Sequence, residues 1–205
     1  MDNYSDFTAK IYDPLLYLAL KQVRTAVMNE LSKYKDKSIL DLCCGTGDQL
    51  KLLSKNGFRN LHCLDSSDSM LKIARKGNCP INIYAEDATK TGLKTGSFNV
   101  IIISFAIHEK DRNTQEIMVN EAHRIMKKNG LMLIVDFIFD ERTMLPGKLG
   151  IVLVERMAGK EHYRNFRNYI KNNGLLSLLK PEKFELIKSE RKLFNGLSIS
   201  LYKKN

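Results

Sequence analysis

The stretch from Ile39 to Leu50, ILDLCCGTGDQL, joins an apolar run to two cysteines and two glycines. Gly45 and Gly47 allow a tight backbone turn and leave room for a ligand, because they lack a Cβ atom. The residues that follow resemble a helix, and the first turn of a helix has backbone N–H groups without partners in the helix. The pattern predicts a strand, a loop and a helix that hold a ligand close to the backbone.

Two aspartates follow the next two predicted strands. Asp65 ends NLHCLD, and Asp87 ends INIYAED. A carboxylate after the second strand can accept hydrogen bonds from both hydroxyls of a ribose. A carboxylate after the third strand can accept one from the exocyclic amine of an adenine. Together the two acids favour a ligand that contains adenosine.

The loop itself distinguishes between adenosine compounds. Leu50 stands where a pyrophosphate-binding G-x-G-x-x-G loop has its third glycine, and the chain has no G-x-x-x-x-G-K-[ST] motif. Asp41 and Asp48 place negative charge beside the turn, which disfavours phosphate and favours a cationic amino group or a sulfonium. We therefore expect S-adenosylmethionine as the cofactor and S-adenosylhomocysteine as its product.

Alternating strands and helices must position these residues. Strands are predicted at SILDLC, NLHCLD, INIYAED, FNVIIISFAI, LMLIVDFIF, FELIKSERKLF and LSISLYKK, the last two as an antiparallel pair around an Asn-Gly turn. Helices are predicted at GDQLKLLSKNG, SDSMLKIARKG and NTQEIMVNEAHRIMKKNG. This order predicts an α/β fold, a Rossmann-like, doubly wound, mostly parallel seven-stranded sheet in an α/β/α sandwich. Its ligand site is expected at the carboxyl ends of the strands, near Cys43, Asp65, Asp87, Ser104 and Asp136.

The length of 205 residues suits one domain with a substantial core, residues 1–205. Residues 5–35 and 140–180 are expected to be mainly helical. No window is long and apolar enough for a membrane span, and MDNYSDFTAK at the start lacks the features of a signal peptide. We expect a cytoplasmic protein.

The four cysteines, Cys43, Cys44, Cys63 and Cys79, show no C-x-x-C spacing, so we expect free thiols in a reducing compartment. Adjacent Cys43 and Cys44 do not suit a zinc site, which uses C-x₂₋₄-C with further ligands nearby. Apolar packing beside the loop is the favoured interpretation of this pair. No metal site is expected.

Charge is concentrated toward the end of the chain. The net charge is +10, and residues 141–205 hold 14 Lys and Arg against 6 Asp and Glu. Such a segment could attract nucleic acid, an anionic membrane surface or an acidic small molecule. The basic residues are scattered, however, which is also typical of an ordinary solvated surface.

The motifs ILDLCCGTGD, LDSSDSML, AEDA, FNVIIISFAIHE and HRIMKKNGLMLIVDF resemble, in order and spacing, those of class I S-adenosylmethionine-dependent methyltransferases. The CCGTGD wording and FTAKIYDPLL near the start are most similar to the menaquinone/ubiquinone-type C-methyltransferase group. The resemblance covers about residues 4–140 and is looser beyond them. Cys43 stands where that family usually has its first loop glycine, and its small side chain is expected to be tolerated.

By position, the resemblance implies a cofactor site built from the strand ends. Residues flanking the amino-acid end of the cofactor would be Asp41, Cys43, Gly45 and Gly47, with Ser104 and Phe105 under its methionine portion. Residues at the ribose and adenine would be Asp65, Ser66, Met70, Asp87 and Ala88. Tyr12 would help to close an N-terminal helical lid, residues 1–35, over the site.

Methyl transfer from a sulfonium asks the protein mainly to position the acceptor and exclude water. His108 follows the fourth strand beside Glu109, where the methyl group should face the acceptor. It could act as a general base, or it could simply cap the next helix. No other catalytic signature is expected in this region.

Residues 157–174, MAGKEHYRNFRNYIKNNG, mix aromatic and basic side chains at helical spacing. One interpretation is a helix that packs its aromatics on the sheet. The other is an acceptor lid within a helical insertion, residues 140–180, in which His162 or Tyr163 reaches the pocket and arginines meet an anionic group. The apolar run TMLPGKLGIVLVERM would make that pocket suitable for a small hydrophobic or amphipathic acceptor, such as a quinone precursor or a lipid.

Three functions are therefore compared. A methyltransferase for such a small-molecule acceptor is favoured, with peripheral membrane contact through the basic C-terminal third. An RNA methyltransferase would explain the charge, but SFAIHE replaces the N-P-P-[YF]-type tetrapeptide and no RNA-binding module is appended. A cofactor-binding protein without catalysis would share the fold. The acceptor atom and the oligomeric state are left open.

Overall fold

The computed structural model describes residues 14–77 and 79–205. Its centre is a seven-stranded sheet in the order β3-β2-β1-β4-β5-β7-β6. The strands are β1 (Ile39–Leu42), β2 (Leu61–Asp65), β3 (Ile81–Ala85), β4 (Phe98–Ser104), β5 (Met126–Phe137), β6 (Phe184–Lys192) and β7 (Leu197–Lys204). β1 to β5 pair in parallel, whereas β7 pairs antiparallel with both β5 and β6. The predicted sheet is confirmed.

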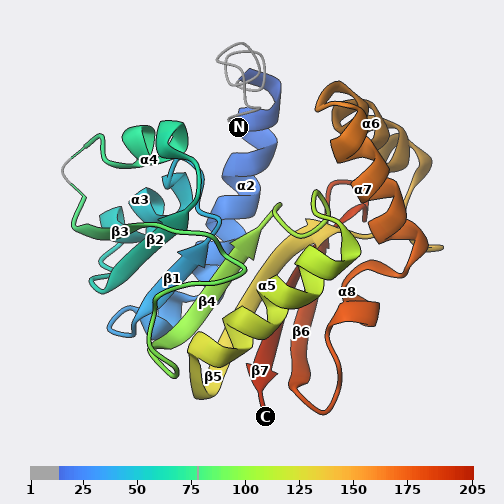
Figure 1. The fold of residues 1–205 in the computed structure, drawn as a ribbon. Coiled ribbons are helices and arrows are strands. Elements are labelled where there is room, and N and C mark those ends of the chain that lie inside the picture. Colours follow the sequence, from blue (N-terminus) through green and yellow to red (C-terminus); the bar gives the residue numbers. More distant parts are fainter. Residues whose placement is uncertain (1–13, 78) are drawn as a thin grey trace.

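Helices cover both faces of this sheet (Figure 1). They are α2 (Pro14–Glu30), α3 (Asp48–Lys55), α4 (Asp68–Ala74), α5 (Arg112–Ile125), α6 (Leu145–Met157), α7 (Lys160–Lys171) and α8 (Gly174–Leu178), with a short 3₁₀ helix at Ser32–Tyr34. One face packs against α2, α3 and α4, and the other packs against α5 and α8. Figure 1 shows α6 and α7 above the carboxyl end of β5. α2 lies within the segment 5–35 that is expected to be helical, and α6, α7 and α8 lie within the segment 140–180. Residues 5–13 of the first segment, including Tyr12, lie outside the described residues.

The central strands are apolar because both of their faces are covered. In β4, Ile101 and Ile103 belong to the core cluster beneath α5, while Val100 and Ile102 belong to the cluster beneath α2, α3 and α4. All four side chains are fully buried. Full burial of an aliphatic side chain contributes about 1.5–3 kcal/mol, so β4 stabilises both layers. From β1 the chain adds β2 and β3 on one side of the sheet and then crosses to add β4 and β5 on the other side. A ligand crevice is expected in such folds where the strand order reverses in this way, between β1 and β4.

The helix before β5 ends earlier than the sequence predicts. We expect it to continue to Gly130, but α5 ends at Ile125 and β5 begins at Met126, which pairs with Phe98 of β4. Asn129 has a φ of 56°, and a Cβ on Gly130 would lie 2.8 Å from the Lys127 carbonyl oxygen. The Asn-Gly pair therefore makes a tight irregularity within the strand and does not end the helix.

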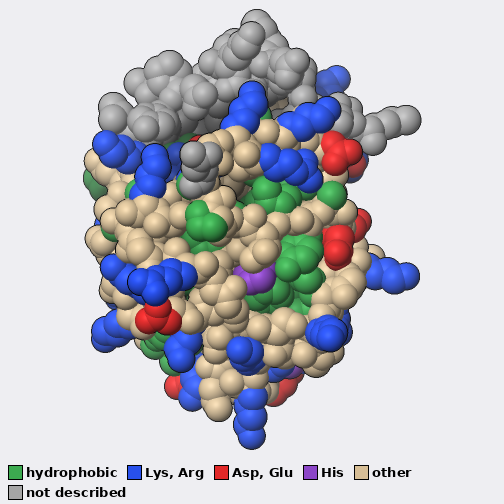
Figure 2. Space-filling view, turned by 90° about the vertical axis from the view of Figure 1, so that its left-hand side faces the viewer, with side chains coloured by type: hydrophobic (Ala, Val, Ile, Leu, Met, Phe, Trp, Pro, Cys, Tyr) green, Lys and Arg blue, Asp and Glu red, His purple; other side chains and the backbone are tan. Residues whose placement is uncertain are grey.

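Charged side chains are spread over the surface. Figure 2 shows the face at the left of Figure 1, where Lys and Arg side chains lie in several small groups around apolar areas, one of which adjoins a histidine. Acidic side chains lie among them, so this face has no continuous basic stripe. Within the described part of the chain, no helix has the length and apolar character needed to cross a membrane.

Candidate functional site: the strand ends

The glycine loop between β1 and α3 has an unusual backbone. Gly45 and Gly47 have φ values of 53° and 70°, and Gly47 caps the N-terminus of α3. A Cβ on Gly47 would lie 3.2 Å from that of Ala74, whereas a Cβ on Gly45 would meet no atom of the described residues within 4 Å. Cys43 also has a positive φ, 67°, which explains physically why a glycine would suit that position. The loop is therefore close-packed beneath and open above Gly45.

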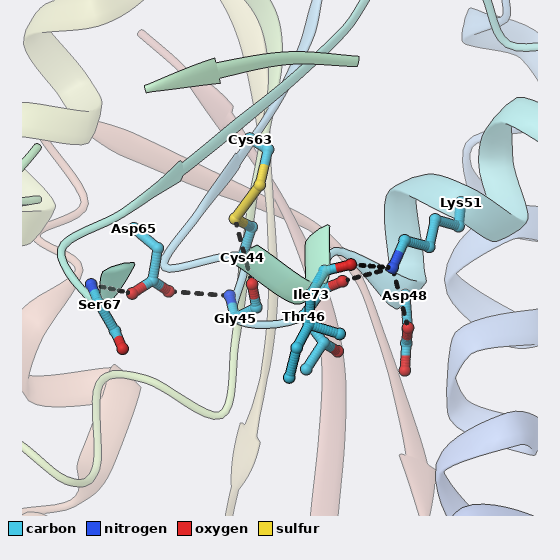
Figure 3. Close-up of a disulfide and its surroundings, with 9 residues drawn as sticks. All are labelled: Cys44, Gly45, Thr46, Asp48, Lys51, Cys63, Asp65, Ser67 and Ile73. Atoms are coloured by element: carbon cyan, nitrogen blue, oxygen red, sulfur yellow. Dashed lines mark hydrogen bonds and ion pairs between the residues drawn. A yellow bond between two sulfur atoms is a disulfide. The ribbon is translucent and has the colours of Figure 1, made fainter. Parts of the chain in front are cut away.

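Asp65 ties the end of β2 to this loop. Its Oδ2 accepts the backbone N–H of Gly45 at 2.8 Å, and its Oδ1 accepts that of Ser67 at 2.9 Å (Figure 3). Each carboxylate oxygen can accept about two hydrogen bonds. Asp65 therefore keeps one acceptor position on each oxygen while it holds the loop.

Asp41, at the centre of β1, is a buried acid with an unsatisfied oxygen. It is 2% exposed, and its Oδ1 has no hydrogen-bond partner within residues 14–77 and 79–205. Burial and the charge of Asp65 raise the pKa of Asp41 to about 8, although Arg24 opposes the shift. An orphaned buried carboxyl is costly unless a donor or a cation reaches it. Asp41 beside the open loop therefore suits a ligand with a cationic amino group, as S-adenosylmethionine has.

Asp48 differs from Asp41, because neighbouring cations already compensate its charge. Arg24 Nη2 lies 3.4 Å from its Oδ2, and Lys51 Nζ lies 3.8 Å from its Oδ1. The Lys51 ammonium also donates to the carbonyl oxygens of Thr46 and Ile73, both at 2.9 Å (Figure 3). Asp48 and Lys51 thus brace the loop, whereas Asp41 forms no ion pair with a described residue and is influenced by Arg24 only at longer range.

The expectation of free thiols is wrong for two of the four cysteines. Cys44 and Cys63 form a disulfide with a Cα–Cα distance of 5.6 Å (Figure 3). Cys43 and Cys79 are free, and burial raises the pKa of the Cys43 thiol. The bridge forms because β1 and β2 are neighbours, with Cys63 opposite Asp41, and the amides of Cys43 and Cys44 both donate to the Leu64 carbonyl. The packing interpretation of the adjacent cysteines therefore fails for Cys44.

The other expected cofactor residues lie at or just after the ends of β2, β3 and β4, with Met70 in the helix that follows β2. Ser66 is exposed at the start of the turn into α4, and Met70 is half-buried in that helix's first turn. Asp87 is exposed, and its Oδ1 accepts the backbone N–H of Thr89 at 2.8 Å and its hydroxyl at 2.7 Å, which lowers the pKa of Asp87. The remaining predicted positions are Ala88, which is buried, and Ser104 and Phe105, which are half-buried.

His108 is fully enclosed at the end of β4. Its Nδ1 lies 2.6 Å from Oδ1 of Asp136 in β5, and its backbone N–H donates to Oδ2 of the same residue at 3.3 Å. Burial lowers the pKa of His108, but the carboxylates of Asp136, Glu155 and Glu109 outweigh burial, so its pKa is raised. Asp136 therefore fixes the orientation of the His108 imidazole. A histidine that only capped the next helix would not need this contact, and the sequence alone does not predict it.

A second histidine meets the first through Glu155. Oε2 of Glu155 lies 2.7 Å from Nε2 of His162 and 3.5 Å from Nε2 of His108. Nδ1 of His162 lies 3.5 Å from Oε2 of Glu109. Sequence reasoning missed Glu155, although a single acid within the apolar run GIVLVERM was a signal that could have revealed it.

Tyr163 follows His162 in α7, and its ring stacks on that of Phe166 with 6.3 Å between the ring centroids. Its ring is flanked by the guanidinium groups of Arg156 and Arg167, whose Cζ atoms lie 5.1 and 5.9 Å from the ring centroid. A separate surface pocket of about 680 Å³ is found at the amino ends of the strands, near Ser38 and Asn60. Neither the glycine loop nor the histidine pair lines that pocket, so it is distinct from the site described here.

Sequence comparisons identify the central part of the chain. Residues 39–130 match the family model described as a methyltransferase domain. The ubiquinone/menaquinone biosynthesis C-methyltransferase UbiE of Campylobacter jejuni is 22% identical over 191 residues, which cover 83% of this chain and 80% of that protein. The demethylmenaquinone methyltransferase of Leptospira interrogans is 33% identical over 108 residues, which cover 48% of this chain and 42% of that protein.

Solved structures share the fold. The crystal structure of a Pyrococcus horikoshii protein has a TM-score of 0.66 at 17% identity, covering 100% of this chain and 96% of that one. The 1,6-didemethyltoxoflavin-N1-methyltransferase of Burkholderia thailandensis, crystallised with S-adenosylhomocysteine, has a TM-score of 0.58 at 13% identity, covering 89% and 76%. These solved structures are similar to this chain in fold. The methyltransferase-domain match over residues 39–130 and the two relatives, taken with the glycine loop and the acids of β1 and β2, support an S-adenosylmethionine-dependent methyltransferase that is similar to the ubiquinone/menaquinone C-methyltransferase group.

Proposed function

We propose that the enzyme methylates a small hydrophobic or amphipathic acceptor, such as a quinone precursor or a lipid, bound between the carboxyl end of the sheet and α6–α7. The single observation that carries the proposal is the His108–Glu155–His162 cluster, which joins the end of β4 to both helices of this region. The names of the Campylobacter jejuni and Leptospira interrogans relatives, both quinone methyltransferases, point to the same class of acceptor.

The cofactor, when bound, supplies a methyl group on a sulfonium that is already a good leaving group. We propose that Asp41 holds its amino group, that Asp65 accepts from its ribose hydroxyls, and that the open face of Gly45 lets the backbone approach. The adenine would be bordered by Ser66 and Met70 and read at its edge by Asp87 and Ala88, and the methionine portion would lie on Cys43, Gly47, Ser104 and Phe105.

The acceptor side is proposed to lie within the insertion of residues 140–180. His108 and His162 would orient the acceptor atom on the methyl axis, because positioning is the main contribution that methyl transfer asks of a protein. Tyr163, between Arg156 and Arg167, would sit at the rim, where two guanidinium groups favour an anionic substituent. The apolar rings around His108, Phe137 at 4.7 Å and Phe166 at 6.1 Å between centroids, would exclude water.

An apolar stripe on α6 supports a lipophilic acceptor. Leu145, Leu149, Leu153 and Met157 recur every fourth residue and are 61–66% exposed. Residues four apart lie on one face of a helix, and Lys148 and Arg156 belong to the same helix. A helix with an exposed apolar face and basic residues can lie in the interface of an anionic membrane. We propose that α6 contacts such a surface and receives the acceptor from it.

Transfer of label from S-adenosylmethionine tests the proposal. The purified chain is incubated with methyl-labelled cofactor and, separately, with a demethylated quinol, anionic phospholipid, a small thiol or RNA. Label is expected in the quinol or the lipid, because these match the apolar surroundings of the histidines. Label found only in RNA would contradict a small hydrophobic acceptor and would indicate an RNA methyltransferase. Binding of S-adenosylhomocysteine without transfer to any acceptor would indicate a protein that binds the cofactor without catalysis.

A further inference from the structure

We propose that His108, Glu155 and His162 form a binding site for a divalent transition-metal ion, with zinc as the first candidate. The three residues come from three different elements: the loop after β4, helix α6 and helix α7. Their potential ligand atoms all lie within 4.8 Å of one another. Residues so distant in sequence converge here through tertiary packing, so the cluster is a built feature of the fold. Metal binding at this site does not depend on which acceptor the enzyme methylates.

Asp136 fixes which nitrogen of His108 is available. Its Oδ1 lies 2.6 Å from Nδ1 of His108 and accepts the backbone N–H of Phe137 at 2.7 Å. Because Nδ1 is engaged, the Nε2 lone pair of neutral His108 would face Glu155. A carboxylate on the second nitrogen of a metal-binding histidine is typical of protein metal sites, since it sets the tautomer and the ring orientation.

The buried carboxylate of Glu155 also supports a metal site. It is 3% exposed, and among the described residues its Oε2 has no hydrogen-bond partner, even though two imidazole nitrogens lie within 3.5 Å. If Nε2 of each histidine is unprotonated, neither ring donates to this oxygen, and a metal ion bound by the three atoms would supply the missing positive charge. A buried carboxylate in this state needs a cation.

The surrounding charges also favour a cation. The carboxylates of Asp136, Glu155 and Glu109 each lie within 3.5 Å of a nitrogen of one of the two imidazoles. Lys110 Nζ pairs with Glu109 at 3.2 Å. Protonated histidines can balance the remaining charge at low pH, and a divalent ion can do so with both imidazoles neutral.

The donor set selects the metal. Two imidazoles and one carboxylate suit Zn²⁺ or Fe²⁺, whereas Mg²⁺ and Ca²⁺ prefer oxygen ligands alone. Zinc bonds of about 2.0–2.2 Å at tetrahedral angles place neighbouring ligand atoms about 3.3 Å apart. The His108–Glu155 distance of 3.5 Å fits this value. The His162–Glu155 contact of 2.7 Å would lengthen by roughly 0.6 Å. The side chain of His162 is 18% exposed, which leaves a route of entry and an open coordination position.

Zinc titration of the full chain tests this site. The protein, freed of metal with a chelator and without an affinity tag, is titrated with ZnCl₂ by calorimetry and with CoCl₂ by visible absorption. One ion per chain is expected, with cobalt bands of a nitrogen and oxygen site, and MgCl₂ should not compete. Absence of stoichiometric zinc binding would overturn the proposal, as would cobalt spectra dominated by thiolate ligands.

Matched histidine variants locate the ion. His162→Gln is the primary variant, because His162 is half-buried and its loss should leave the fold intact. We expect it to weaken zinc affinity by at least the 10–100-fold that loss of a second-layer partner alone causes, and Glu155→Gln should do the same. His62→Gln is the control, since His62 contacts Tyr84 and Asn60. Zinc should raise the melting temperature of wild type and His62→Gln, and not that of His162→Gln. Equal affinity in all variants would sink the assignment.

Discussion

Gly45 and Asp65 are joined by a hydrogen bond of 2.8 Å from the loop amide to the carboxylate. This contact links the ends of two neighbouring parallel strands, β1 and β2, at the point where the loop is open. One carboxylate therefore shapes the loop and still presents acceptor positions to a ligand above it. Asp65→Asn can separate the shaping of the loop from ligand binding, because asparagine keeps one carbonyl oxygen as an acceptor and removes the negative charge.

Substitution of Asp65 should remove cofactor binding. Hydrogen bonds to charged groups contribute about 1.5–3 kcal/mol each, so losing the two ribose contacts in Asp65→Ala should weaken S-adenosylhomocysteine binding by about 100-fold or more. Asp65→Asn should fall between this variant and wild type. Isothermal calorimetry measures both affinities. An affinity unchanged in Asp65→Ala would show that the ribose is held elsewhere.

Cofactor binding should release a proton at neutral pH. Burial raises the pKa of Asp41 to about 8, so the ligand-free carboxyl is largely protonated at pH 7. A cationic amino group favours the charged carboxylate, and affinity for S-adenosylmethionine should therefore increase as pH rises from 6 to 8. Calorimetry in buffers of different ionisation enthalpy counts the protons. Asp41→Asn should bind weakly and release none, and equal proton release in both proteins would contradict this role.

The same acid should make unfolding depend on pH. Its pKa is raised from 3.8 to about 8 in the folded chain, so the folded state binds more protons than the unfolded state between these values. The contribution of Asp41 to the free energy of unfolding is then largest below pH 4 and is lost as pH rises toward 8. Urea titrations of wild type and Asp41→Asn should converge in acid and show the variant relatively more stable at pH 8. Parallel curves across this range would exclude the shift.

Reduction of the disulfide should loosen the glycine loop. The bridge spans 19 residues in sequence, and a loop of this size contributes about 3 kcal/mol in the chain-entropy model. The variant Cys44→Ser with Cys63→Ser should therefore unfold at lower urea concentration, and wild type treated with a reductant should do the same. Cys79→Ser is the matched control. Thiol titration of the unreduced, unfolded chain should detect two thiols. Detection of four thiols would show that the disulfide does not form.

Charged substitutions on α6 should weaken binding to lipid vesicles. Leu149 and Leu153 are 62% and 61% exposed on the proposed membrane-facing stripe, so Leu149→Glu and Leu153→Glu place charge where apolar contact is needed. Each should reduce co-sedimentation with anionic vesicles by several-fold, since one buried leucine contributes about 1.5–3 kcal/mol. Leu176→Glu, at a 71% exposed position on α8, controls for added charge. Equal losses in all three variants would indicate a non-specific effect.

The sheet and its loop could be predicted because their signals are local. The doubly covered strand β4 is continuously apolar, and Gly45 and Gly47 mark the turn where φ is positive. The end of α5 could not be predicted, because Met126 leaves the helix to pair with Phe98, a partner 28 positions earlier. Local propensity is overridden there by strand pairing.

The disulfide and the histidine cluster could not be predicted from the sequence for a related reason. Cys44 meets Cys63 only once the register of β1 against β2 is known. Glu155 meets His108 and His162 only once α6 and α7 have docked above β5. Spacing along the chain carries no information on such contacts, whereas each residue's chemistry was visible from the start.

The position of β7 between β5 and β6 sets an order of assembly during translation. Ser198 of β7 pairs with Asp136 of β5, and its hydroxyl donates to the Asp136 carbonyl at 3.2 Å. β6 precedes β7 in the chain but joins the sheet only through it. A nascent chain that has reached residue 192 therefore still presents the apolar edge of β5 unpaired, which is a hazard for association with other chains. The edge of β5 is protected only after β7 has emerged from the ribosome. Asp136, which contacts His108, gains its hydrogen bond from Ser198 at the same stage.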